Sequence, residues 1–234
     1  MRELALFAGA GGGILGGKLL GWRTVCAVEI DPYARAVLLA RQRDGHLERF
    51  PIWDDIRTFD GHQWRGRVDV VSGGFPCQAF SSAARGRNNA ADLWPDMLRV
   101  IRCVRPMHVF AENVKRHPIE RAAADLCRLG YGASFGELSA GALGAPHKRS
   151  RWWLRGDAHC DGQPVEPKYE KTSRLLSACE DVWTRDEMRS FRVPDGVAGR
   201  VDRLRAAGNG QIPIVAAVAW DVLGSAMGGK RAGG

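Results

Sequence analysis

Two apolar segments of the chain end directly before a chemically active side chain. Residues 68–72 (VDVVS) lead into the loop GGFPCQ, which carries the thiol of Cys77, and residues 108–111 (HVFA) lead into the carboxyl group of Glu112. Open α/β sheets bind ligands at the carboxyl ends of their strands, so both groups are expected in one pocket. A cysteine in such a loop is placed to act as a nucleophile. Taken singly, the cysteine fits an unreactive loop, and Glu112 fits a solvated residue or a helix cap.

A third segment, APHKRSRW at 145–152, supplies positive charge. Its two arginines, Arg149 and Arg151, alternate along a predicted strand and so are expected on one face of it. The plain alternative is a solvated strand edge.

A glycine-rich turn follows the first apolar run, in the segment FAGAGGG at 7–13, and Glu29 ends the second run about 20 positions later. Glycines let the backbone approach a ligand closely, and an acidic residue at that distance can bind ribose hydroxyls. The pattern therefore predicts a nucleoside cofactor. By itself it is equally compatible with NAD or FAD.

The elements that must position these groups alternate along the first 155 residues. Apolar runs at 4–7, 24–28, 68–72, 108–111 and 151–154 predict strands, and three- and four-residue apolar spacing at 33–43, 93–105 and 119–129 predicts helices. A further helix is predicted at 212–227. The expected class is α/β, with a mostly parallel sheet and flanking helices. Residues 156 to about 200 are polar and punctuated by Pro and Gly, as in a small insertion.

Composition sets limits on function. The 234 residues include 34 basic and 26 acidic side chains, and the net charge of +8 favours a polyanionic partner. The six cysteines lack a CxxC pair, so neither a metal site nor disulfides are expected. An apolar stretch of the length of a membrane span is absent, and the start lacks the features of a signal peptide. We therefore expect a cytoplasmic protein without a membrane role.

The sequence resembles the DNA (cytosine-5)-methyltransferase family over nearly its whole length and in the family's motif order. The matching segments are FAGAGG at 7–12, EID at 29–31, GFPCQ at 74–78, ENV at 112–114, RSR at 149–151 and GNG at 208–210. The resemblance implies a Rossmann-like S-adenosylmethionine-dependent methyltransferase fold. It also implies a catalytic domain at 1–155 plus 203–227, a short target-recognition region at 156–202 and a tail at 228–234.

The implied activity is methylation of cytosine C5 in double-stranded DNA, in a bacterial or phage restriction-modification setting. S-adenosylmethionine is the implied methyl donor, S-adenosylhomocysteine the product, and a monomer the expected form. On this resemblance Cys77 adds to C6 of a flipped-out cytosine, Glu112 contacts N3 and the amino group, and Arg149 and Arg151 supply positive charge. The cofactor-binding residues it implies are Phe7, Gly9, Gly11, Gly12, Glu29, Ile30, Asp55, Ile56, Pro76, Leu93 and Asn209. The expected DNA-binding residues are Gln78, Ser81, Arg85, Arg87, Arg174, Arg185, Arg189 and Arg192.

The sequence departs from the family pattern at four places. His147 stands where Gln is usual, Ala5 stands where Asp is frequent, Asn209 is followed by Gly-Gln-Ile-Pro, and the recognition region is abbreviated. A tRNA cytosine-C5 methyltransferase and a catalytically inactive DNA-binding paralogue stay open as alternatives. A nicotinamide oxidoreductase would leave Cys77 and Glu112 unexplained.

Overall fold

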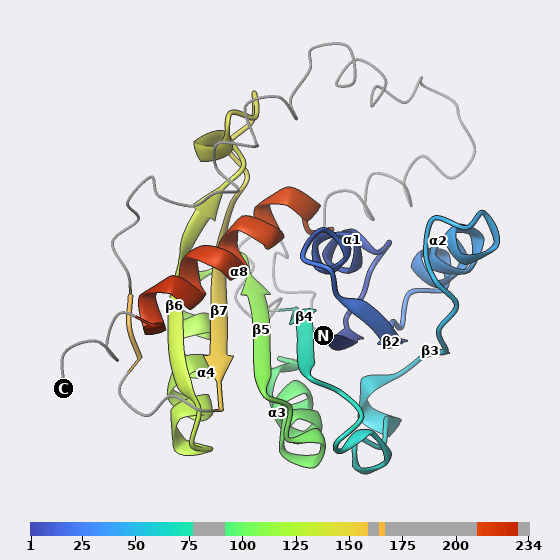
Figure 1. Cartoon of the computed structure of the whole chain (residues 1–234), viewed down its shortest axis with the longest axis horizontal. Helices are drawn as coiled ribbons and strands as arrows, with labels where there is room; N and C mark the ends of the chain where they lie inside the picture. Colours follow the sequence, from blue (N-terminus) through green and yellow to red (C-terminus); the bar gives the residue numbers. More distant parts are fainter. Residues whose placement is uncertain (77–91, 159–163, 167–209, 229–234) are drawn as a thin grey trace, which may run out of the picture.

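The computed structural model describes residues 1–76, 92–158, 164–166 and 210–228. Within them one seven-stranded sheet has the order β3-β2-β1-β4-β5-β7-β6 (Figure 1). Its strands are β1 (Arg2–Leu6), β2 (Arg23–Val28), β3 (Ile52–Trp53), β4 (Val70–Gly74), β5 (His108–Asn113), β6 (Gly132–Ser139) and β7 (Ser150–Asp157). The α-helices are α1 (Gly12–Leu19), α2 (Pro32–Arg43), α3 (Trp94–Val104), α4 (Arg116–Arg128) and α8 (Pro213–Gly228). Short 3₁₀ turns lie at η1 (Ile56–Thr58), η2 (His62–Trp64) and η5 (Gly141–Leu143).

The strands from β3 to β5 run parallel, whereas β7 pairs antiparallel with both β5 and β6. The amino end of β7 consequently lies at the sheet edge where the parallel strands have their carboxyl ends. In the β5–β7 register Glu112 faces Trp153, so Arg151, two residues earlier on β7, projects from the same face of the sheet.

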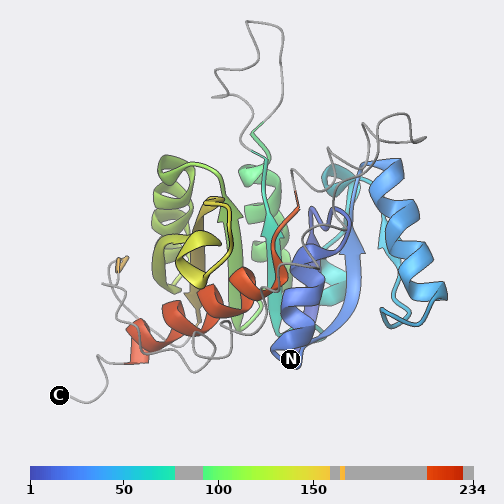
Figure 2. The same cartoon turned by 90° about the horizontal axis from the view of Figure 1, so that it is seen from above.

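Two apolar layers enclose the sheet (Figure 2). One face packs against α3 and α4 through a core that includes Leu4, Val71 and Ile101. The other face packs against α8 through Val70, Phe110 and Leu223, while α1 and α2 continue this layer over β1 and β2. Period-two alternation along β1 and β4 sends successive side chains into opposite layers.

Local sequence explains where several elements begin. Asp31 caps α2 by accepting hydrogen bonds from the backbone N–H groups of Tyr33 (2.8 Å) and Ala34 (3.2 Å), and Pro32 stands at the first helical position. The turn into α1 uses left-handed backbone at Gly9 (φ +54°) and Gly11 (φ +92°), which glycine adopts without strain.

The α/β class and the mostly parallel sheet with flanking helices are confirmed, and each predicted helix and strand overlaps an observed one. Two strands, β3 and β6, were not predicted. β3 has only two residues, and β6 (GASFGELS) contains two glycines and polar residues that are poor strand signals on their own. The predicted place of Arg149 on a strand is wrong, because it precedes β7 with a left-handed backbone (φ +31°).

Candidate active site

A buried ion pair lies at the carboxyl edge of the sheet. Glu112, near the end of β5, is 6% exposed, and its Oε1 lies 3.0 Å from Nε of Arg151 on β7 in an ion pair. Arg151 also donates from Nη1 to the backbone oxygen of Ser150 at 2.8 Å. The antiparallel course of β7 is what places the guanidinium beside the carboxylate.

The second carboxylate oxygen faces the segment before α8. Nε2 of Gln211 donates to Oε2 of Glu112 at 3.4 Å. Burial raises the pKa of the Glu112 carboxyl above its usual value, while the charge of Arg151, the Gln211 hydrogen bond and the charge of Arg149 oppose the rise. A carboxyl group in this environment can hold a proton at a pH where an exposed glutamate has lost it.

Arg149 serves a different partner. Its guanidinium donates to the backbone oxygen of Gly210, which ties the start of β7 to the segment before α8. Burial lowers the pKa of Arg149 from its very high ordinary value, with the charge of Arg151 acting in the same direction. The two arginines therefore lie at one edge, but in the described structure only Arg151 pairs with Glu112.

The loop that leads to Cys77 is held against β5. Nδ2 of Asn113, which is 3% exposed, donates to the backbone oxygen of Phe75 at 2.9 Å. Phe75 is itself buried against Trp94 of α3, with ring centroids 5.1 Å apart. Pro76 is the last described residue here, and Cys77 lies outside the described residues. The hydrogen bond from Asn113, the neighbour of Glu112, thus holds the chain at Phe75, two residues before the predicted nucleophile.

A cavity opens at the carboxyl ends of β1 and β4, and Glu112 forms part of its wall. It is lined by Ala5, Leu6, Phe7, Ala8, Gly9, Gly13, Ile14, Ser72, Gly73, Gly74, Glu112, Gly210 and Gln211. A Cβ added at Gly9 would meet no atom within 4 Å, so the backbone there is open to a ligand. This position, above parallel strands and a glycine turn, is where open α/β sheets bind their ligands.

Glu29 lies at the end of β2 beside the same turn. Its Oε2 accepts from the backbone N–H of Gly9 at 2.6 Å, and its Oε1 accepts from the N–H of Asp31 at 2.8 Å. These bonds fix the carboxylate at the rim of the glycine turn. Remaining lone pairs on both oxygens can accept from ribose hydroxyls, so the carboxylate fits the predicted cofactor.

Four other predicted cofactor residues are Ile30, Asp55, Ile56 and Leu93. Ile30 is 57% exposed, whereas Ile56 is buried in the core. Asp55 caps η1 from the position before it and pairs with Arg57 at 2.6 Å, and the hydrogen bond from Arg57 lowers the pKa of its carboxyl group. Leu93 immediately precedes α3. None of these four lines the cavity beside Glu112.

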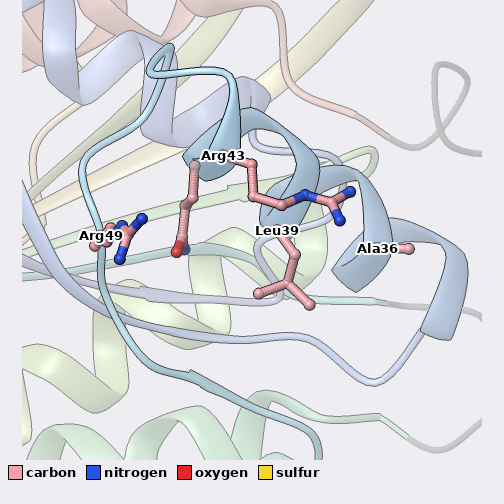
Figure 3. A pocket seen from close by; sticks show the side chains of 5 residues that line it. Ala36, Leu39, Arg43 and Arg49 are labelled. Atoms are coloured by element: carbon pink, nitrogen blue, oxygen red, sulfur yellow. The ribbon is translucent and has the colours of Figure 1, made fainter.

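A second hollow lies on the outer surface of α2, lined by Ala36, Leu39, Gln42, Arg43 and Arg49 (Figure 3). It is shallow and open, and it contains no carboxyl, thiol or imidazole group. Its composition offers no group that could carry a reaction, so we do not place the site there.

The predicted site residues that lie outside the described residues are Cys77, Gln78, Ser81, Arg85, Arg87, Arg174, Arg185, Arg189, Arg192 and Asn209. Conversely, the structure reveals two residues that were not predicted, Asn113 and Gln211. Each lies within two residues of a predicted site residue, Glu112 or Asn209. A sequence pattern does not show, however, which side-chain amide has a buried hydrogen-bond partner.

Two structural findings bear on ligands and surroundings. The described residues hold no group of three or more His, Cys, Asp or Glu side chains arranged to bind a metal ion. None of the helices in residues 1–76, 92–158 and 210–228 combines the length and apolar character needed to span a bilayer.

Comparison with known proteins places the chain in a family. The family model described as C-5 cytosine-specific DNA methylase matches residues 1–183. Type II methyltransferase M.PspPI of a Psychrobacter species is 40% identical over 113 residues, covering 47% of this chain and 26% of that protein. Type II methyltransferase M1.HphI of Haemophilus parahaemolyticus is 34% identical over 168 residues, covering 64% of this chain and 44% of that protein. The matches thus span less than half the length of these relatives.

Solved structures share the fold. A prophage-encoded DNA modification methyltransferase of Escherichia coli matches 67% of this chain and 46% of its own, with a TM-score of 0.53 and 24% identity. The Dnmt2 methyltransferase of S. pombe matches 76% of this chain and 54% of its own, with a TM-score of 0.57 and 22% identity. The Rossmann-like methyltransferase fold is therefore confirmed, and the sequence match assigns the family. The chain belongs to the C-5 cytosine-specific DNA methylase family.

Proposed function

We propose that the chain is a DNA cytosine-C5 methyltransferase that uses Cys77 as a covalent nucleophile. The observation that carries the proposal is the buried Glu112–Arg151 pair at the wall of a cavity beside the Phe75–Pro76 segment. A protonated carboxyl group can donate to N3 of cytosine and accept from its exocyclic amine. The family's printed relatives are Type II methyltransferases, which supports DNA as the substrate and a restriction-modification setting.

The reaction needs the ring to be activated first, because C5 of cytosine is a weak nucleophile. The Cys77 thiolate forms a bond to C6, and Glu112 delivers its proton to N3 as the ring accepts the electron pair. Arg151 stabilises the carboxylate that Glu112 then becomes. The C5 carbon, now part of an enamine, would attack the methyl carbon of a bound sulfonium donor, whose carbon–sulfur bond would break with the electron pair left on sulfur. A base removes the C5 proton, and the electrons of that bond expel Cys77 from C6 while Glu112 recovers its proton from N3.

S-adenosylmethionine supplies an electrophilic methyl group when bound, and S-adenosylhomocysteine is the product. The predicted holders are the turn at Gly9, Gly11 and Gly12, with Phe7 packing on the adenine side. Glu29 would accept from the ribose hydroxyls. The remaining residues proposed to complete the site are Ile30, Asp55, Ile56, Pro76, Leu93 and Asn209.

The target atom lies inside a base stack, so the cytosine must leave the duplex before Cys77 can reach C6. We propose that Gln78, Ser81, Arg85 and Arg87 contact the DNA around the flipped base. The proposed domain division is 1–155 plus 203–227 for catalysis, 156–202 for recognition and 228–234 as a tail. We expect a monomer to act in the cytoplasm of a bacterial or phage-infected cell.

The recognition region is proposed to read a short or degenerate sequence. A small platform with few apolar residues holds few side chains firmly in the major groove, and each bidentate contact discriminates by about 1–3 kcal/mol. The candidate readers are Arg174, Arg185, Arg189 and Arg192. Replacing each by Ala and mapping methylated contexts tests this. A relaxed context at one position identifies a reader, and four variants with the wild-type context and rate would remove the region from recognition.

Replacing Cys77 by Ser tests the covalent mechanism. Bisulfite sequencing of DNA from cells that express the wild-type chain should reveal methylated cytosines, and Cys77→Ser should abolish them. Cofactor binding, measured by calorimetry, should change little because other residues hold the cofactor. Methylation by the serine variant at close to the wild-type rate would rule out the covalent adduct.

Two further assays separate the alternatives. Duplex DNA and tRNA offered side by side should show label from the methyl donor on DNA alone; label confined to tRNA would favour the RNA enzyme. DNA that contains 5-fluorocytosine should form a covalent adduct with the chain. A merely binding paralogue cannot form that adduct.

A further inference from the structure

Gln211 lies between the first residues of α1 and the carboxyl group of Glu112. A Cβ added at Gly12 would lie 2.0 Å from the backbone oxygen of Gln211, and one at Gly13 would lie 2.3 Å from its Oε1. A Cβ at Gly74 would lie 3.1 Å from its Nε2. Three glycines from α1 and β4 therefore leave the room that the Gln211 backbone and side chain occupy.

Gln211 and Arg151 face different oxygens of Glu112. Nε of Arg151 lies 3.0 Å from Oε1 in an ion pair, and Nε2 of Gln211 donates a hydrogen bond to Oε2 at 3.4 Å. The two partners come from different elements: Arg151 belongs to β7, and Gln211 precedes α8 by two residues. A cation at one oxygen and a hydrogen-bond donor at the other restrict rotation of the carboxyl group about its last bond.

We propose that Gln211 is a positioning residue for Glu112, whose amide fixes the orientation of the carboxyl group and favours its ionised form. The inference deepens the proposed function, because it concerns the group assigned there as proton donor. Gln211 lies outside the family motif GNG at 208–210. Its proposed role therefore rests on the contact with Glu112 and not on the motif.

The charged groups that face Glu112 determine how large the effect should be. Arg151 and Arg149 both favour the carboxylate, and burial opposes it. Gly74, the nearest residue of β4, brings no charge. Loss of one hydrogen bond to a buried carboxylate should raise its pKa by about one unit, at the lower end of such effects because 3.4 Å is long.

The test compares Gln211→Met with wild type, because Met keeps the length of the side chain and lacks the donor. Carboxyl ¹³C NMR of glutamate-labelled protein gives the titration of Glu112, assigned by the signal missing from Glu112→Gln. We expect an increase in the Glu112 pKa of about one unit. Gln42→Met is the matched control, since Gln42 also donates to an oxygen, that of Phe50 at 3.1 Å, but lies on α2. It should leave the titration unchanged.

A kinetic measurement separates positioning from packing. If Glu112 must carry a proton, kcat for DNA methylation falls above its pKa, and Gln211→Met should move that falling limb to higher pH by about one unit. Gln211→Glu, which keeps the size and adds a second carboxyl group, should move it further. A purely structural role would lower the rate equally at every pH.

A folded Gln211→Met variant with the wild-type Glu112 titration would overturn the inference. If Gln211→Met does not fold, Gln211→Glu replaces it, and an unchanged titration in that variant has the same meaning. The NMR experiment needs neither DNA nor cofactor. Absence of methylation by the wild-type chain would therefore contradict the proposed function while the titration still decides the role of Gln211.

Discussion

Glu112 combines burial with an ion pair to Arg151 and a hydrogen bond from Gln211, and this combination makes its protonation state the sensitive point of the site. Replacing it with Gln preserves the shape but removes the proton that the ring must receive. We expect Glu112→Gln to slow methylation by about 10²–10⁴-fold, the range typical for loss of a general acid. Single-turnover kinetics on bound DNA measure this directly.

DNA affinity is the control for that variant. The amide can still donate to or accept from the base, so duplex binding measured by fluorescence anisotropy should weaken far less than the rate falls. A variant that binds DNA poorly yet methylates bound DNA at the normal rate would make Glu112 a residue that holds the base instead of a proton donor.

At the scale of elements, the close contact of β1 with β4 shapes the edge on which the site is built. Gly73 faces Leu6 in the parallel register, and an added Cβ would lie 2.5 Å from the backbone oxygen of Leu6. Because backbone atoms cannot move aside, the strands would have to separate. We expect Gly73→Ala to reduce the free energy of unfolding by about 1–3 kcal/mol, measured by urea denaturation.

Gly141 provides the matched control for that change. A Cβ at Gly141 would have its nearest neighbour at 3.4 Å, an ordinary contact, and its φ is not left-handed. Gly141→Ala should therefore leave the urea midpoint nearly unchanged. Equal stability of the two variants would show that the sheet edge yields more easily than the static distance implies.

The stability of the whole molecule should depend on a carboxyl group that takes no part in the proposed reaction. Glu3 is 1% exposed, and burial raises its pKa to about 7, although hydroxyls of Ser72 and Thr24 donate to it at 2.6 Å. Between the unfolded value of 4.5 and about 7, the folded chain keeps a proton that the unfolded chain releases. The stability contributed by Glu3 therefore falls as pH rises through this range.

Glu3→Gln removes this titration and keeps the size of the side chain. Relative to wild type, the variant should gain about 3 kcal/mol in free energy of unfolding between pH 4.5 and pH 8. Urea denaturation of both proteins at the two pH values measures the difference, and exposed Glu137→Gln is the control. A constant difference at both pH values would mean that Glu3 ionises equally in the folded and unfolded chains.

The fold class and the family of the protein could be predicted from its amino-acid sequence. Apolar periodicity predicted the α/β class, and the segments around Cys77 and Glu112 predicted a shared edge because parallel strands bring their carboxyl ends together. Family membership followed from motifs in a fixed order and is confirmed by the match over residues 1–183. Short-range patterns of this kind are encoded in neighbouring residues, so they need no knowledge of long-range pairing.

Long-range pairing was required for the rest. Only the antiparallel insertion of β7 between β5 and β6 brings Arg151 to Glu112, since a parallel strand would carry it to the opposite edge. The direction of a strand depends on the neighbouring strands with which it packs. The sequence pattern of residues 150–157 does not indicate whether the strand pairs parallel or antiparallel. The same holds for Gln211, which is 99 positions from Glu112 in sequence and meets it because α8 packs on that face of the sheet.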